Sequence, residues 1–164
     1  MSIANQLSNE LKQLKGFASS HAKVVTLDDA DGNQLSIDFN AVDSMSCAFE
    51  ELRLNIPSLD GSSIETIEDW AKELSNRVTY LLENIGPLEF DPTLKQGLVR
   101  STPPDKSEDG TKFYEILLKA TGNGSFTLKR YESETGTPGR TQVNLQMTHE
   151  QLLKLTEDLF ETIP

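Results

Sequence analysis

The stretch from Ser62 to Gly86 constrains the fold most, because it has the periodicity of one amphipathic helix between two segments rich in strand-forming residues. Ser62 and Glu65 have the spacing of a capping box, which marks a helix start. Gly86 and Pro87 are typical of a helix end. The pattern predicts a long central helix whose apolar stripe needs a sheet or another helix to cover it. The stripe consists of Ile64, Ile67, Ala71, Leu74, Val78, Leu81 and Ile85.

The two ends of the chain also carry helical patterns. Apolar residues fall on one face between Ser2 and Phe17, which predicts a first helix. Thr148 and Gln151 form a second capping box, and the apolar stripe that follows continues to Ile163. We therefore expect a helix at each terminus in addition to the central one.

The segments between these helices alternate apolar and polar residues in the manner of β-strands, and turn-forming residues separate them. Residues 19–21 and the polar, acidic segment 102–112 are predicted as connections. Short turns between strands imply antiparallel pairing. The expected fold class is α+β, an antiparallel twisted sheet with a central helix at about 62–86 and helices at both termini, in one domain of residues 1–164. The predicted strands cover residues 23–27, 35–41, 46–56, 88–90, 98–101, 113–120, 126–131 and 141–147.

Two details of strand register follow from the hydrophobic pattern. The strand at 46–56 changes the phase of its apolar residues, which predicts a bulge at Glu50 and Glu51. In the later strands, a three-residue glycine loop would pair Ala120 with Phe126 and keep the apolar residues of both strands on one face.

The chain is strongly acidic, with 26 acidic and 15 basic residues and a net charge of −11. The basic residues are scattered, so we expect neither a nucleic-acid partner nor binding to an anionic membrane. A cationic protein surface would be attracted, although the charge also keeps a protein soluble. Cys47 is the single cysteine, no apolar run reaches the length of a membrane span, and the N-terminus lacks a signal-peptide pattern. We therefore expect a cytoplasmic location.

Candidate catalytic and metal-binding residues form no recognisable motif. The only histidines, His21 and His149, are far apart in the sequence, and Cys47 lies in an apolar strand pattern that predicts a buried, inert thiol. The acidic turn after Leu27 resembles a calcium loop, but Leu27 and Asp38 stand where that loop needs an acidic ligand and a glutamate. A hairpin turn is the expected structure there. We expect no cofactor and no metal, and we expect the protein not to be an enzyme.

Four large side chains do not fit the predicted inner face. Leu117 and Tyr131 point outward in the predicted register, Trp70 borders the central helix stripe and Tyr80 lies beyond it. An apolar patch with a polar rim is a common protein-contact surface, so these four residues are the candidate binding residues. The alternative is that other elements of the chain cover them, because single exposed apolar residues are normal.

The order of elements and the acidity resemble the type III secretion chaperone-like fold. The matching parts are the Ser2–Phe17 helix, the strands from Lys23 to Ile56, the Ser62–Gly86 helix, and the last strands with the Thr148–Ile163 helix. The chain departs from that family by extra strands after the central helix and by its acidic, proline-containing loop. The resemblance implies a homodimer that binds segments of partner proteins, although a fold alone does not determine function.

These observations leave three hypotheses about function. The leading one is a non-enzymatic protein-interaction module, chaperone-like or adaptor-like, with a protein partner or a homodimer as its complex. It would bind through an exposed sheet face, a sheet edge or a helix groove. The alternative is a small-ligand sensor or carrier with a pocket between the sheet and the helices. The third is an enzyme whose acid–base groups converge from separate elements in one cleft.

Overall fold

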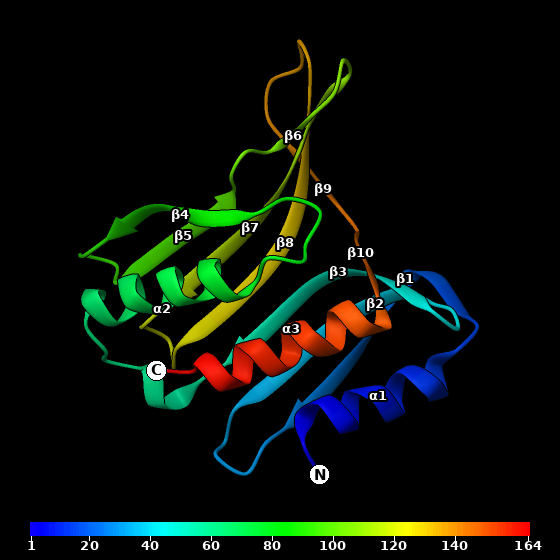
Figure 1. The fold of residues 1–164 in the computed structure, drawn as a ribbon, viewed down its shortest axis with the longest axis horizontal. Helices are drawn as coiled ribbons and strands as arrows, with labels where there is room; N and C mark the ends of the chain where they lie inside the picture. The colour runs from blue at the N-terminus through cyan, green and yellow to red at the C-terminus, as the bar shows by residue number, and fades with distance from the viewer.

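Three helices cover one face of an antiparallel sheet in the computed structural model, which describes all residues from 1 to 164 (Figure 1). The helices are α1 (Ile3–Leu14), α2 (Ile64–Arg77) and α3 (His149–Thr162), and a short 3₁₀ helix spans Pro57–Leu59. The predicted α+β fold class is confirmed, with helices at the start, the middle and the end of the chain. None of these helices combines the length and the apolar character that crossing a bilayer requires.

The sheet has ten strands, and its main path runs in the order β1-β2-β3-β8-β7-β5-β4. In addition, β10 pairs with β3, β9 with β8 and β6 with β7. The strands are β1 (Phe17–Asp28), β2 (Gln34–Val42), β3 (Ser46–Asn55), β4 (Ile85–Asp91), β5 (Gln96–Ser101), β6 (Asp105–Lys106), β7 (Gly110–Lys119), β8 (Ser125–Glu134), β9 (Thr141–Val143) and β10 (Leu145–Thr148).

The sheet divides in its middle because β3 and β8 pair over only part of their length. Residues 52–55 of β3 pair with residues 125–128 of β8, whereas the first half of β3 pairs with β10. The rest of β8 continues with β7 and β9 into an arm that projects beyond the helices (Figure 1). The inner face of this arm therefore lies partly beyond the helical layer.

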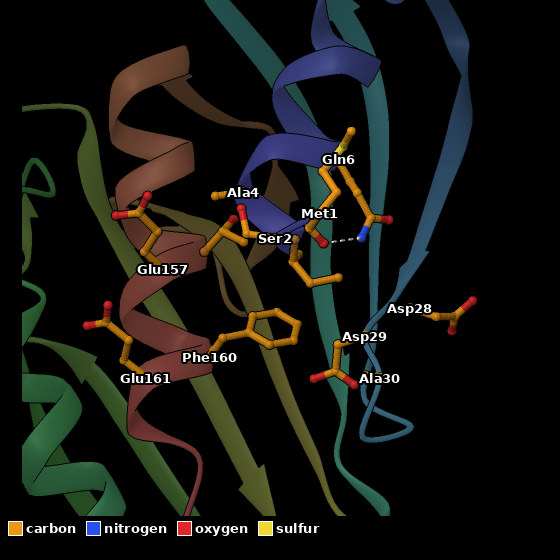
Figure 2. Close-up of a pocket in the computed structure, with 12 residues that line it drawn as sticks. Met1, Ser2, Ala4, Gln6, Asp28, Asp29, Ala30, Glu157, Phe160 and Glu161 are labelled. Carbon is orange, nitrogen blue, oxygen red and sulfur yellow. Dashed lines mark hydrogen bonds between the residues drawn. The ribbon is translucent and has the colours of Figure 1, made fainter.

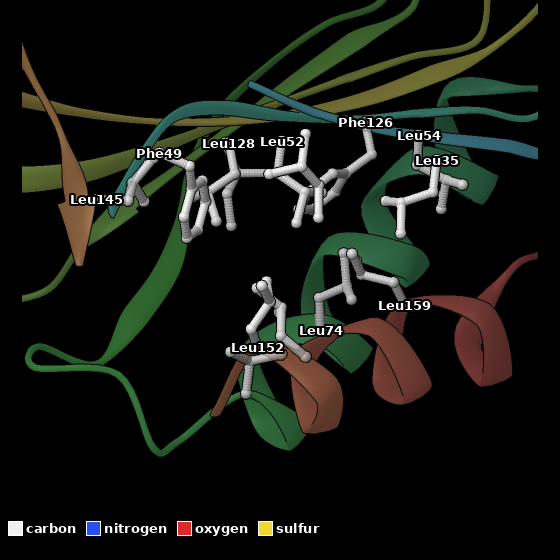
Figure 3. Packing of buried hydrophobic residues seen from close by; sticks show 14 of the residues in the cluster. Leu35, Phe49, Leu52, Leu54, Leu74, Phe126, Leu128, Leu145, Leu152 and Leu159 are labelled. Atoms are coloured by element: carbon white, nitrogen blue, oxygen red, sulfur yellow. The ribbon is translucent and has the colours of Figure 1, made fainter. Parts of the chain in front are cut away.

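The core is a cluster of 35 buried residues between the helices and the inner face of the sheet. In Figure 3, Phe126 and Leu128 of β8 face Leu74 of α2 and Leu152 and Leu159 of α3. Full burial of one such side chain stabilises the fold by about 1.5–3 kcal/mol. The alternation of apolar residues along the strands thus explains why all three helices lie on the same face.

The central helix is shorter than the sequence pattern predicts. α2 begins at Ile64 with Ser63, not Ser62, as its N-cap, and it ends at Arg77 instead of near Gly86. The Ser63 hydroxyl accepts a hydrogen bond from the backbone N–H of Thr66 at 3.3 Å. The residues that follow Arg77 are not helical up to the start of β4.

The weak helix propensity of Val78, Thr79 and Tyr80 explains this early end, because β-branched and aromatic side chains lose rotamer freedom in a helix. The apolar stripe was nevertheless a correct guide to burial, since Val78 and Leu81 are buried from an irregular segment and Ile85 is buried from β4. Pro87 lies within β4, an edge strand, where a missing backbone N–H is tolerated.

β1 is longer than predicted and contains residues 19–21, which the sequence pattern had assigned to a connection. Its register with β2 is interrupted between Ala18, which pairs with Ala41, and Lys23, which pairs with Phe39. The polar segment 102–112 is likewise partly in strands, because it contains β6 and the start of β7. Residues 19–22 have no partner in β2 and form this irregularity of β1, whereas cross-strand backbone pairing outweighs the polar composition in β6 and at the start of β7.

The predicted bulge at Glu50 and Glu51 is confirmed. Ile37 pairs with Leu52 and Phe39 pairs with Phe49, so two residues of β3 lie opposite one residue of β2. The bulge brings the apolar residues on both sides of it to the inner face.

The hairpin between β7 and β8 has the predicted face but not the predicted register. Leu118, not Ala120, pairs with Phe126. Because side chains alternate with a period of two, this two-residue shift keeps the same residues on the inner face. The physical reason is that the backbone of Ala120 bonds elsewhere. Its N–H donates to Lys95 at 2.9 Å and its carbonyl accepts from Gly61 at 2.9 Å.

This loop gives a test of the packing. Gly124 has φ +72° and an added Cβ would overlap the Ile56 carbonyl oxygen and Leu59, whereas Gly122 has φ +63° and open space around it. We expect Gly124→Ala to lower the free energy of unfolding by about 2–5 kcal/mol, from left-handed strain and overlap together. Gly122→Ala, the matched control, should cost about 1–2 kcal/mol. Urea unfolding followed by circular dichroism measures the free energy of unfolding of both variants. Equal losses in the two variants would contradict the close contact of Gly124 with Ile56 and Leu59.

Candidate functional site

Trp70 belongs to the core and not to an exposed surface. It is 1% exposed, and its indole N–H donates to the Thr162 hydroxyl at 3.2 Å. Its ring lies 6.3 Å from that of Phe126, measured between centroids. The last turn of α3 covers this part of α2, so Trp70 is not accessible to a partner.

Tyr80 is half-buried against the same helix. Its hydroxyl donates to a carboxylate oxygen of Asp158 at 2.6 Å, and its carbonyl accepts from the Gln151 side chain at 3.1 Å. Burial and this hydrogen bond raise the pKa of Tyr80 above its ordinary value, so the phenol stays protonated and donates. Tyr80 therefore fastens the segment after α2 to α3.

Leu117 and Tyr131 lie on the face of the sheet opposite to the helices, and both are half-buried. The ring of Tyr131 stacks on Phe113 with centroids 5.8 Å apart, and the Arg140 guanidinium lies 3.8 Å from the Tyr131 centroid. Arg140 also pairs with Glu115. The four predicted contact residues thus lie on two sides of the sheet and form no common surface.

Cys47 and His149 each contact a backbone carbonyl, and His21 lies at the surface. The Cys47 thiol is buried and donates to the Met147 carbonyl at 3.6 Å, and burial raises its pKa to about 12. At neutral pH it is therefore a thiol, which is a poor nucleophile. The ring of His149 lies 3.2 Å from the carbonyl oxygen of Ser46, and His21 is exposed on β1.

The acidic turn between β1 and β2 is a hairpin connection, as predicted. The Asp29 carboxylate accepts hydrogen bonds from the backbone N–H groups of Asp31 and Asn33 at 2.9 and 2.8 Å, and from the Asn33 side chain at 2.9 Å. These bonds hold the turn in one conformation. The structure contains no group of three or more His, Cys, Asp or Glu side chains arranged to hold a metal ion.

A hollow of about 520 Å³ lies where α1 begins, α3 ends and the β1–β2 turn approaches them (Figure 2). We call it the terminal groove, and it is lined by residues within 1–6, 28–30 and 156–161. Phe160 points from α3 toward the start of α1, and Asp29 lies on the far wall (Figure 2). Ile3 and Ala4 are buried beneath, so the groove has an apolar floor.

The rim of the terminal groove is acidic. Asp29 comes from the turn, and Asp28, the last residue of β1, points its carboxylate away from Phe160 (Figure 2). Glu157 and Glu161 leave α3 on the flank away from Phe160 (Figure 2). The lining contains no lysine, arginine or histidine. An apolar floor between acidic walls is suited to contact with another macromolecule.

A smaller polar pocket of about 270 Å³ borders the arm and the segment after α2. There Arg130 donates to both carboxylate oxygens of Glu83, at 2.9 and 3.1 Å, and both side chains are 7% exposed. Ser101 donates to Glu83 at 3.1 Å and accepts from the Tyr114 N–H at 2.7 Å. The guanidinium lies 4.2 Å from the Tyr114 ring centroid. This network ties residue 83 to the sheet.

Comparisons with protein-family models, with curated proteins and with solved structures find no match to this chain. The resemblance in layout to the type III secretion chaperone-like fold therefore stays a prediction.

Sequence reasoning did not find either hollow. Phe160 fits the spacing of the last apolar stripe, which does not show that it borders a hollow. Glu83 and Arg130 are 47 residues apart, so no local pattern connects them. Acidic residues near the end of α3 were the one available sign of the groove, because negative charge is unfavourable at a helix C-terminus.

The buried ion pair gives a second test. We expect Glu83→Ala to lower the free energy of unfolding by about 3–5 kcal/mol, because Arg130 then stays buried without a counter-charge. The double variant Glu83→Leu/Arg130→Met should recover most of this loss, since it leaves no unpaired charge. Urea unfolding of the single and double variants measures the effect, with exposed Glu108→Ala as control. A loss below about 1 kcal/mol in Glu83→Ala would contradict the buried pairing.

Proposed function

We propose that the protein is a non-enzymatic protein-interaction module, chaperone-like or adaptor-like, and that it binds a segment of a partner protein in the terminal groove. The observation that carries this proposal is the half-buried Phe160 side chain, which lies over an apolar floor in a hollow of about 520 Å³. A volume of this size accommodates a few side chains of a partner.

The walls of the groove favour binding because they are held in place before a partner arrives. Asp29 fixes the turn by three hydrogen bonds, and α1 and α3 pack against each other. Pre-organised walls reduce the entropy that is lost on association.

The sheet edges are less suited to binding an extra strand. β1 is an edge strand with an irregular register near Lys23, and β4, the other edge, contains Pro87 and a register shift after it. Bulges, lysine and proline are the means by which proteins protect edges from pairing with other chains. This supports the groove over an edge as the docking site.

A different protein is a better partner than a second copy of this chain. The net charge is −11 and the groove rim is acidic, so two copies repel each other. The same charge supports the absence of nucleic-acid and membrane partners. We also propose the cytoplasm as the location, because the single cysteine is buried as a thiol.

Photo-crosslinking in cells tests the proposal. The photoreactive residue p-benzoylphenylalanine replaces Ala30, which is exposed on the groove wall, and Thr127 on the opposite sheet face is the control position. We expect a discrete protein adduct from position 30 only, and mass spectrometry should identify a single crosslinked segment of the partner. A synthetic peptide with the sequence of that segment should compete with the partner and abolish the adduct. Adducts of equal yield and pattern at positions 30 and 127 would contradict the proposal.

A small-ligand carrier or sensor is the second candidate function, and the polar pocket favours it. Arg130 lines that pocket, and Glu83 takes two of its five N–H donors. A small molecule with a carboxylate could accept from the others. Titration with acetate and with glycine, followed by ¹H–¹⁵N NMR, should shift the amides of Tyr114 and Arg130. A dissociation constant weaker than about 1 mM for both probes would reject this candidate.

A further inference from the structure

We infer that the terminal groove accepts a cationic amphipathic segment, in which an apolar side chain rests on Phe160 while lysines or arginines beside it face the acidic rim. This inference rests on the proposed function and adds the chemistry of the partner. It follows from the pairing of each rim carboxylate, from the direction of α3 and from the apolar floor.

The rim carboxylates differ in how far the chain itself neutralises them. Glu161 pairs with Arg77, and Asp29 is occupied by its own turn. Asp28 accepts only from the neutral side-chain amide of Gln34, at 3.0 Å. Glu157 is exposed and takes part in none of the ion pairs of the structure. Glu157 is thus the rim carboxylate on α3 that no basic side chain of the chain pairs with, whereas the Asp28 carboxylate points away from Phe160 (Figure 2).

The direction of α3 adds to this negative potential. The helix ends at the groove, and its last turn contains no basic residue. The C-terminal end of a helix carries a partial negative charge and favours nearby cations. Glu161 stands in the last turn, where that dipole disfavours acidic side chains, and such departures from local stability rules concentrate at functional sites. The single cationic group in the lining is the amino terminus at Met1.

Accessible apolar side chains on the walls, above the apolar floor, distinguish this groove from a cluster of acidic residues. Phe160 is half-buried, Ala30 is exposed and Met1 is 84% exposed, so an apolar side chain of the partner can displace water from all three. A net charge of −11 steers a cationic segment toward the protein before contact. The occupant that satisfies both features is amphipathic and basic.

Fluorescence anisotropy with three labelled synthetic peptides tests the inference. One is an amphipathic peptide of leucine and lysine, the second replaces every lysine by glutamate, and the third replaces every leucine by serine. We expect the leucine–lysine peptide to bind at least about tenfold more tightly than either of the others. Its binding should weaken as salt is raised, because the rim charges are exposed.

Two matched charge reversals separate the groove from the overall charge. Glu157→Lys should weaken binding of the leucine–lysine peptide by about tenfold, a loss of about 1.4 kcal/mol. Glu108→Lys changes the net charge equally but lies in the exposed connection between β6 and β7, outside the lining of the groove, and should change binding by less than about twofold. Circular dichroism of both variants checks that the fold is unchanged.

The outcomes also separate this inference from the proposed function. If the leucine–glutamate peptide binds as tightly and crosslinks to position 30, the groove is a docking site but the partner is not cationic. If Glu157→Lys and Glu108→Lys weaken binding equally, only the net charge attracts the peptide, and the inference is overturned. If no peptide crosslinks at position 30 and cells yield no adduct there, the proposed function itself fails.

Discussion

The packing of α3 between α1 and α2 is the constraint on which the rest of the structure depends (Figure 1). α3 is the last element of the chain, yet it contacts both other helices and completes the cover of the sheet. Its apolar stripe fills the core, and its polar side chains reach α2 and the segment after it through Thr162–Trp70 and Asp158–Tyr80. The terminal groove is a direct product of this packing, because the start of α1 meets the end of α3 there.

Buried polar groups hold the chain where regular secondary structure stops. After Arg77 the helix ends, but Tyr80 is bonded to α3 and Glu83 to Arg130 of the sheet. A buried carboxylate that loses its partners costs far more than a surface one, so these contacts specify one path for the segment. The same path places Leu82 at the edge of the polar pocket. The path of the segment after α2 and the polar pocket therefore both depend on the hydrogen-bond network around Glu83 and Arg130.

The sequence predicted the features that depend on neighbours along the chain. Helical and alternating patterns correctly indicated the fold class, the capping box at Thr148 and the bulge at Glu50. Even the wrong register between β7 and β8 left the inner face correct, because the shift was two residues. The end of α2 was mispredicted because apolar spacing indicates burial, and an irregular segment together with β4 buries the same residues. Trp70 follows the alternative that other elements of the chain cover it, although spacing did not reveal which element would do so.

The sequence by itself determined that the chain is acidic and that one face of each helix and strand must be buried, since both properties are local. Only the tertiary structure decided which charges stay unpaired. Asp158 and Glu157 are adjacent, yet Asp158 is 4% exposed and bonded to Tyr80, Arg77 and Lys154, whereas Glu157 faces solvent at the groove. The reason is physical: neighbours on a helix point in different directions, and what each one meets depends on segments that are distant in the sequence.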